Sequence, residues 1–194
     1  MNETRSASLK YLRLGGLLAH WDSYLKLAAE KRFSHDHLLN HVVTEECRIK
    51  RENARQRRLR GAHIPEALVI ETFPFARQPK LNKKKIMELY DTLGYMRHSQ
   101  NIIWLGATGC GKTGLATSFL IHAINQGYTG RYVLFADLVS ELYRAVADHS
   151  EAKVLKTYGA IECLQVDSCE AVKNVEWQGS VSLWESASGG ANST

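Results

Sequence analysis

The chain has 194 residues, of which 44% are hydrophobic and 23% are charged, and its net charge is +5. This composition is typical of a soluble globular protein of one or two domains, and no apolar run reaches the ~20 residues that a membrane span needs. The first residues lack the apolar segment of a signal peptide, so we expect a cytoplasmic protein. The four cysteines form no CxxC pair, which argues against a zinc site.

The first expected domain, residues 1–62, is helical. Leucines recur at helical spacing from residue 9 onward, and Ser34 is placed to cap a long helix that Gly61 would end. Three histidines cluster near the start of this helix without further metal ligands. We interpret them as surface or interface residues; they are His35, His37 and His41.

The end of this helix, residues 48–60, holds seven basic residues against the single acidic residue Glu52. Such a density of positive charge attracts phosphate backbones without reading base sequence. The alternative is a solvated helix face, and charge alone does not decide between the two. The arginines that we expect to contact DNA are Arg48, Arg51, Arg55 and Arg58.

Residues 63–98 are expected to form a linker followed by a helix. All three prolines of the chain fall in this segment, which marks irregular structure. Phe73 and Phe75 would anchor the linker against the following domain, and the helix is expected over about residues 82–98.

Residues 99–167 alternate between short apolar strands and helices. We expect strands at 101–105, 131–135 and 163–166, each separated from the next by a helical segment. This alternation is typical of a parallel α/β sheet with right-handed crossovers. The remaining residues, 168–194, show no sustained period, and we expect most of them to be poorly ordered.

The sequence GATGCGKT, residues 106–113, matches G-x-x-x-x-G-K-[ST] between the first strand and its helix. Glycines let backbone N–H groups converge on phosphates, and the helix that starts at Lys112 directs its positive end toward them. Lys112 would neutralise the β- and γ-phosphates, and the Thr113 hydroxyl would bind Mg²⁺. The residues expected to hold ATP are Gly106, Ala107, Thr108, Gly109, Cys110, Gly111, Lys112 and Thr113.

Asp167 follows the third strand and is expected to supply the carboxylate on the Mg²⁺ side of the site. Its alternative role is a cap of the strand end. Ser168 comes next, and its hydroxyl cannot serve as the carboxylate base that orients an attacking water. Lys112 and Asp167 are therefore the expected catalytic residues, Thr113 and Asp167 are the expected metal ligands, and hydrolysis is expected to be impaired.

Together these features resemble the IstB-like transposition helper ATPases, relatives of the DnaC-type helicase loaders in the AAA+ class. The resemblance covers about residue 8 to Asp167. It rests on the leucine-rich start and on four segments in the family's order, which are EECRIKRENARQRRLRGAHIPE, FPFARQPKLN, NIIWLGATGCGKTGLATSF and YVLFADLVSELYRA. It implies that the chain binds ATP, assembles on DNA as a ring or filament, and directs a transposase to its target.

The resemblance also implies a division of roles along the chain. The helical domain, 1–62, would engage transposase or DNA. The segment 63–98 would hold adenine through the stretch from Phe73 to Gln78, which contains Phe75. Residues 99–167 would form an incomplete AAA+ type P-loop α/β domain, with Asp167 at the Walker B position. An atypical tail, 168–194, would follow.

This sequence departs from the family after Asp167, where the family continues with a catalytic glutamate, further strands, a sensor and an arginine finger. We expect a frameshift or premature stop in the coding sequence. The family's strand order, 5-1-4-3-2, places the P-loop strand between two strands without a counterpart here, so we expect residues 99–167 to fold poorly. Strand 101–105 would pair either with 163–167 or with VSLW in the tail.

Two functions follow from these observations, and the sequence leaves both open. The first is an ATP-binding transposition helper with impaired turnover. The second is a module that binds DNA or transposase without useful ATP chemistry. A small-molecule P-loop kinase is not favoured, because the sequence offers no candidate for an acceptor-binding lid.

Overall fold

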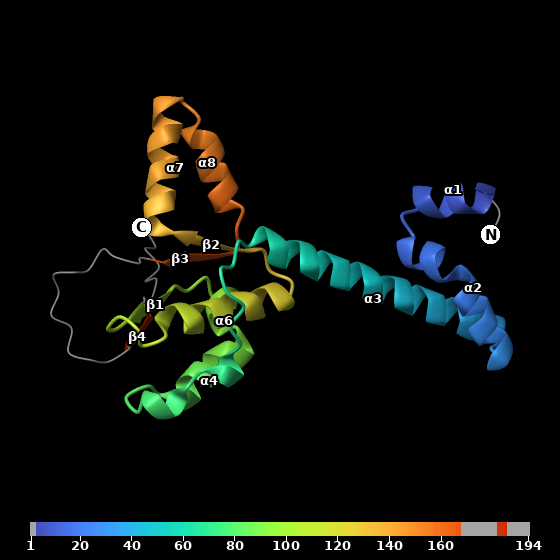
Figure 1. Ribbon diagram of the computed structural model, residues 1–194, viewed down its shortest axis with the longest axis horizontal. Coiled ribbons are helices and arrows are strands. Elements are labelled where there is room, and N and C mark those ends of the chain that lie inside the picture. Colours follow the sequence, from blue (N-terminus) through green and yellow to red (C-terminus); the bar gives the residue numbers. More distant parts are fainter. Residues whose placement is uncertain (1–2, 168–181, 186–194) are drawn as a thin grey trace, which may run out of the picture. The chain divides into compact units, whose positions relative to one another are not determined.

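The computed structural model describes residues 3–167 and 182–185 (Figure 1). Internal contacts divide the chain into two compact units, Met1–Arg57 and Arg58–Thr194. The first unit is helical and the second combines helices with strands, as the sequence predicted. No helix among the described residues is both long enough and apolar enough to cross a bilayer.

The first unit contains three helices, of which the last continues into the second unit. Short breaks separate them, so residues 5–62 are not helical throughout. The predicted cap is confirmed, because the backbone N–H of His37 donates to Ser34 Oγ at 3.2 Å, and the long helix ends at Gly61 as expected. The helices are α1 (Glu3–Tyr11), α2 (Gly15–Glu30) and α3 (His35–Gly61).

Helices α2 and α3 are joined by a buried carboxylate. Glu46 on α3 is only 6% exposed, and its Oε2 accepts a hydrogen bond of 2.8 Å from the backbone N–H of Leu17 in the first turn of α2. The first turn of a helix has unsatisfied N–H groups and favours a negative charge. Gly16 permits this approach, since a Cβ there would lie 2.7 Å from Glu46 Oε2 and 2.5 Å from Ile49 Cδ1.

Residues 63–98 form the connecting segment of the second unit, and this segment contains four short helical elements. The helix expected over about 82–98 is interrupted at Leu93, which has a φ of +50°. Asn82 caps the longer piece by accepting from the Lys85 backbone N–H at 3.0 Å. The elements are η1 (Ile70–Thr72), η2 (Phe75–Arg77), α4 (Lys83–Thr92) and α5 (Gly94–Arg97).

The predicted alternation of strands and helices is present in the rest of the unit, with two differences. Phe135 starts a helix instead of ending a strand, and residues 151–159 form a further helix that the sequence analysis did not identify. The elements are β1 (Ile102–Leu105), α6 (Lys112–Asn125), β2 (Gly130–Leu134), α7 (Phe135–Ala147), α8 (Glu151–Gly159), β3 (Cys163–Asp167) and β4 (Ser182–Glu185).

The described strands form two separate pairs. Strands β2 and β3 are parallel, in a register that sets Gly130 opposite Cys163 and Leu134 opposite Asp167. Strand β1 pairs antiparallel with β4, so the second of the two expected partners is the one observed, through Ser182, Leu183 and Trp184 of the VSLW segment. The parallel sheet therefore does not include β1, and residues 182–185 are an exception to the expected disorder. The rest of that expectation lies outside the described residues.

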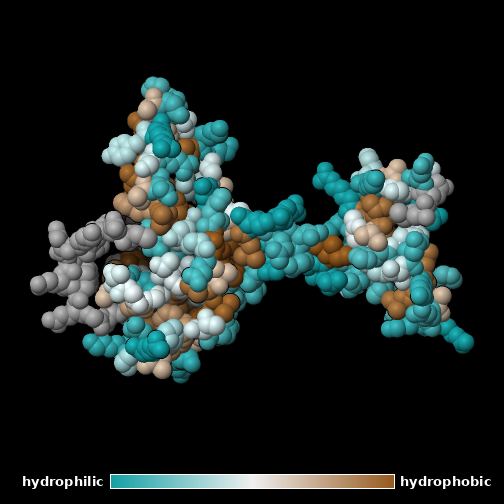
Figure 2. Space-filling view, viewed as in Figure 1, coloured by the Kyte–Doolittle hydropathy of each residue, from teal (hydrophilic) through white to brown (hydrophobic). Residues whose placement is uncertain are grey.

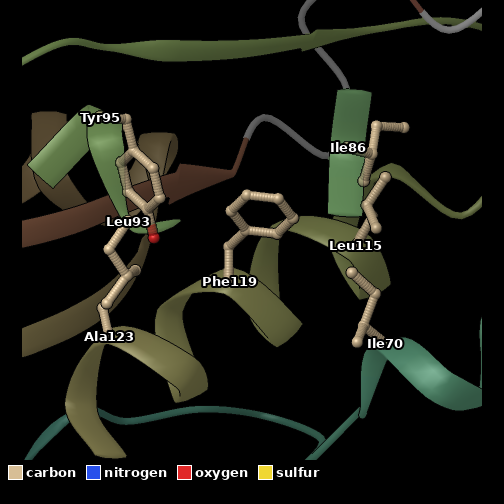
Figure 3. Packing of buried hydrophobic residues seen from close by; sticks show 7 residues of the cluster. All are labelled: Ile70, Ile86, Leu93, Tyr95, Leu115, Phe119 and Ala123. Atoms are coloured by element: carbon tan, nitrogen blue, oxygen red, sulfur yellow. The ribbon is translucent and has the colours of Figure 1, made fainter. Parts of the chain in front are cut away.

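The core of the second unit surrounds α6. In Figure 1, β2 and β3 lie between α6 and a hairpin formed by α7 and α8. Figure 3 shows Phe119 of α6 between side chains of the connecting segment, and its ring lies 5.7 Å from that of Tyr95. The cluster consists of Ile70, Ile86, Leu93, Tyr95, Leu115, Phe119 and Ala123.

Candidate nucleotide-binding site

The glycine loop lies between β1 and α6, in the context that a phosphate-binding loop requires. Gly109 and Gly111 have φ values of +79° and +87°, a region that favours glycine. A Cβ at Gly111 would also lie 2.8 Å from Phe73 Cε2. Both the backbone conformation and the lack of space therefore favour glycine at this position. The loop ends where α6 begins, and its backbone N–H groups are therefore next to the positive end of a 14-residue helix.

The Lys112 side chain folds back over the loop. Its Nζ donates to the carbonyl oxygens of Gly106 at 2.9 Å and Ala107 at 2.8 Å, and it lies 3.9 Å from Cys110 Sγ. The ammonium group is therefore held against the loop by the loop's own carbonyl oxygens. A bound phosphate would compete with the two carbonyl groups for this charge.

The Phe73–Gln78 segment contacts the loop directly. The Phe73 ring packs on Gly111, and Gln78 Nε2 donates to the Cys110 carbonyl at 3.4 Å. Phe75 lies behind, with its ring centroid 4.8 Å from that of Phe73. Phe73 therefore contacts the loop, and Phe75 packs against Phe73. Gln78 is an additional loop contact to which the sequence analysis assigned no separate role.

Asp167 is the last residue of β3 and is close to the start of α6. It lines a cavity of about 410 Å³ together with Lys112 and Thr113, so the three residues expected to act on phosphate and metal border the same cavity. Its Oδ2 accepts a hydrogen bond of 3.2 Å from Tyr132 Oη on β2. Mg²⁺ prefers oxygen ligands, so the Thr113 hydroxyl and the Asp167 carboxylate fit the metal.

Two contacts that fix Asp167 were missed in the sequence. Tyr132 holds the carboxylate itself. Gln165 Nε2 donates to Thr117 Oγ1 at 3.2 Å and thereby ties β3 to α6, the helix that follows the loop. The sequence signal for both contacts was the alternation of side chains along a strand. It places Gln165 and Asp167 on one face of β3, and the register of β2 with β3 sets Tyr132 opposite Gln165. That register is a tertiary property.

The four predicted DNA-contacting arginines follow one face of α3, at spacings of three and four residues. Figure 2 shows mostly hydrophilic side chains along the middle of this helix. Arg48 and Arg51 are exposed, whereas Arg55 and Arg58 are half-buried and Arg58 Nε is enclosed without a hydrogen-bond partner.

Two of these arginines are paired with glutamates on the same helix. Arg48 Nη2 lies 2.9 Å from Glu45 Oε2, and Arg55 Nη2 lies 2.7 Å from Glu52 Oε1. Hydrogen bonds from Arg55 and Gln56 lower the pKa of Glu52 to about 2. The positive potential of this face is therefore partly neutralised within the helix.

Residues 7–176 match the family described as IstB-like ATP binding protein. The match continues past Asp167, which corrects the end point inferred from the sequence. An ATP-binding protein of insertion sequence IS5376 from Geobacillus stearothermophilus is 29% identical over 84% of this chain and 64% of its own length. Its counterpart in insertion sequence IS21 of Pseudomonas aeruginosa is 27% identical over 82% of this chain and 60% of its own length. The chain thus spans less than two thirds of these relatives.

Proposed function

The chain belongs to the family of IstB-like ATP binding proteins, and we propose from this premise that it binds ATP with Mg²⁺ as a transposition helper. The observation that carries the proposal is the convergence of Lys112, Thr113 and Asp167 on one cavity at the N-terminus of α6. The glycine loop would surround the phosphates, Lys112 would neutralise them, and Thr113 and Asp167 would hold the metal.

We propose that Phe73 and Phe75 border the adenine side of the site. The contact of Phe73 with Gly111 and the bond from Gln78 to Cys110 support this role, because they fasten the segment to the loop. Hydrolysis is proposed to be slow. The residue after Asp167 is Ser168, and its hydroxyl cannot take the role of a carboxylate base.

The proposed partners are DNA, a transposase and further copies of the chain, in the cytoplasm. The arginine face of α3 supports a DNA contact, since its charge would attract phosphates. Exposed apolar side chains on the same unit support a protein partner. They include Leu25, Leu39 and Val43. We retain the expected domain limits, 1–62, 63–98, 99–167 and 168–194, as a functional division.

The test is titration of a fluorescent ATP analogue with Mg²⁺ into the chain and into Lys112→Ala. Loss of the ammonium group should weaken binding at least about 100-fold. Lys153→Ala removes an exposed lysine from α8 and serves as the matched control, with unchanged affinity expected. Equal binding by Lys112→Ala and the unaltered chain would contradict the proposed site.

A second candidate is a module that binds DNA or transposase without ATP chemistry. The basic face of α3, which is remote in sequence from the glycine loop, favours it. The same variant separates the two candidates, because Lys112→Ala should leave DNA binding intact if α3 acts alone. A loss of DNA binding in Lys112→Ala would show that nucleotide and DNA binding are coupled.

A further inference from the structure

Helix α3 exposes an apolar stripe in the part that belongs to the first unit. Leu39 and Val43 are 66% and 61% exposed, and Cys47 is a free, exposed thiol. The three residues follow one another at intervals of four, so they share one face of the helix. The buried and half-buried residues of this part of α3 are centred on a different side. They are Leu38, His41, Val42, Glu45, Glu46 and Ile49.

A charged residue follows the stripe at each end. Asp36 precedes Leu39 by three residues, Lys50 follows Cys47 by three residues, and both charged residues are exposed. The face therefore consists of an acid, three apolar positions and a base, with Val43 at its centre. Its spacing of three, four, four and three residues reads the same in both directions. These five residues form the Val43 face.

The Val43 face is complementary to a second copy of itself. If two α3 helices pack antiparallel with Val43 opposite Val43, Leu39 of each copy lies opposite Cys47 of the other. Asp36 of each copy then lies opposite Lys50 of the other, so opposite charges meet at both ends. A parallel pair would instead set Asp36 against Asp36 and Lys50 against Lys50, and like charges repel.

We propose that the Val43 face binds a second copy of this chain as an antiparallel helix pair, with its two-fold axis at Val43. In residues 3–57, Leu9 is the one buried hydrophobic residue, so covering Leu39 and Val43 would add apolar burial that the first unit lacks. The face spans residues 36–50, about 20 Å of helix, and a contact of this size forms a weak pair. The proposal gives a surface to one of the proposed partners, further copies of the chain, and does not depend on ATP binding.

The contacts of the two charged residues within the chain permit this pairing. Lys50 Nζ lies 4.0 Å from Glu46 Oε1, and the Lys50 side chain is 50% exposed. Asp36 Oδ2 accepts a hydrogen bond of 3.1 Å from Asn40 Nδ2. An ammonium group has three donors and a carboxylate has about four acceptor sites, so each group can take a further partner. The Val43 face contains none of the four arginines proposed to contact DNA, so a helix pair can form without using them.

The test is disulfide trapping of the full chain, without nucleotide, under copper phenanthroline and air. Leu39→Cys places a thiol opposite Cys47 of the second copy. Within one helix these positions are about 12 Å apart, too far for a disulfide. The control is Asn53→Cys, which places an exposed thiol outside the Val43 face. The disulfide between positions 39 and 47 should form at least about tenfold faster than that between 53 and 47. Peptides digested without reduction identify the bonded positions.

Charge variants of Leu39→Cys test the ends of the face. Lys50→Glu sets two carboxylates opposite each other and should slow trapping by about threefold to tenfold. Adding Asp36→Lys exchanges the two charges, restores the opposite pairs and should return the rate. If the exchanged variant stays as slow as Lys50→Glu, the proposed charge pairing is overturned.

Three further outcomes would overturn the proposal. Equal trapping of Leu39→Cys and Asn53→Cys would indicate random collision. A faster bond between two copies of Cys47 would indicate a parallel pair. No trapping at all would indicate that a different protein covers the face. None of these outcomes bears on the proposed ATP site, because the experiment contains no nucleotide.

Discussion

Each of the two units is stabilised internally by a different kind of interaction. Leu9 is the one buried hydrophobic residue of the first unit, and every other buried hydrophobic side chain in residues 3–167 belongs to the second. The first unit relies on Glu46 and on aromatic contacts, such as Tyr24 with His41 at 5.5 Å. The second unit relies on apolar packing around α6.

This difference indicates what each unit needs from its surroundings. A unit with little buried apolar surface gains little stability from packing, and its helices depend on polar contacts or on a partner. The first unit also exposes large apolar side chains that a partner could cover. They are Tyr11, Leu12, Leu25, Leu39 and Val43. We therefore expect substitutions in the two units to differ in the size and in the kind of their effects.

The largest expected effect is from Phe119→Ala, which removes the central ring of the α6 core. Phe119 is 4% exposed and contacts the rings of Tyr90, Tyr95 and Trp104. Its truncation should lower the free energy of unfolding of the second unit by about 3–5 kcal/mol. Denaturant unfolding followed by tryptophan fluorescence would measure the change, with Trp21 of the first unit replaced by phenylalanine in both proteins.

Tyr143→Ala is the matched control for this substitution. Tyr143 is an aromatic residue of α7 that is 74% exposed, so its truncation should change stability by no more than about 0.5 kcal/mol. Equal effects of the two substitutions would show that α6 does not organise the core. The same experiment tests the expected weakness of residues 99–167, because a poorly folded domain would show no cooperative transition at all.

The next effect concerns the first unit. Glu46→Ala leaves the Leu17 N–H without its acceptor and removes a charge from the start of α2. We expect a loss of about 1–2 kcal/mol, because a partly buried donor without a partner carries part of its desolvation cost. Thermal unfolding by circular dichroism and hydrogen exchange at Leu17 would measure it.

Glu45→Ala serves as the control at the adjacent position. Glu45 is paired with Arg48, whose side chain is 68% exposed, and such pairs contribute little to stability. If Glu45→Ala were as damaging as Glu46→Ala, the stability of the first unit would depend on general helix charge and not on one buried bond.

A smaller effect is expected from alkaline pH, at Cys163 of the second unit. Burial raises the pKa of the Cys163 thiol to about 11. The folded chain thus holds this proton more tightly than the unfolded chain. The contribution to stability is complete below pH 9 and is lost as the pH rises toward 11, by on the order of 2 kcal/mol.

Urea unfolding at pH 8 and pH 10 would measure this loss, and Cys163→Ala should remove the part of it that is due to the thiol. In the folded chain, alkylation at pH 8 should also be slower at Cys163 than at the exposed Cys47. Equal rates would show that Cys163 is accessible and that its pKa is not raised.

The sequence predicted the features that depend on local patterns. The cap at Ser34, the helix end at Gly61 and the glycine loop before Lys112 follow from residue type and spacing, and all are present. The helix at 151–159 was missed because no strong periodicity separates it from the preceding helix. Only two residues of this helix, Val154 and Tyr158, are half-buried.

The pairing of strands could not be derived in the same way. The sequence left two partners open for β1, and the choice of Ser182–Glu185 depends on residues far apart along the chain. The contacts of Tyr132 with Asp167 and of Gln78 with Cys110 are likewise tertiary. Local patterns thus located the phosphate site, whereas the side chains that support it became visible only in three dimensions.

The smallest expected effect on stability is at α3, where one substitution should leave stability unchanged and alter DNA affinity. Glu52 binds Arg55 through both carboxylate oxygens and has a pKa of about 2, so it stays ionised above about pH 3. A change of physiological pH cannot release Arg55, but Glu52→Gln removes the negative charge. Glu52 is exposed and Arg55 is half-buried, and pairs of this kind within a helix contribute little, so this substitution should hardly alter stability.

DNA affinity should respond instead. If Arg55 then neutralises one more phosphate, the slope of log affinity against log salt should steepen by about one unit. Glu88→Gln changes the net charge equally but lies on α4, so its slope should stay that of the unaltered chain. Identical slopes for both variants would remove Arg55 from the proposed DNA contact. A steeper slope for Glu52→Gln alone would show that α3, which is stabilised by few buried residues, contributes to DNA binding through its exposed positive charge.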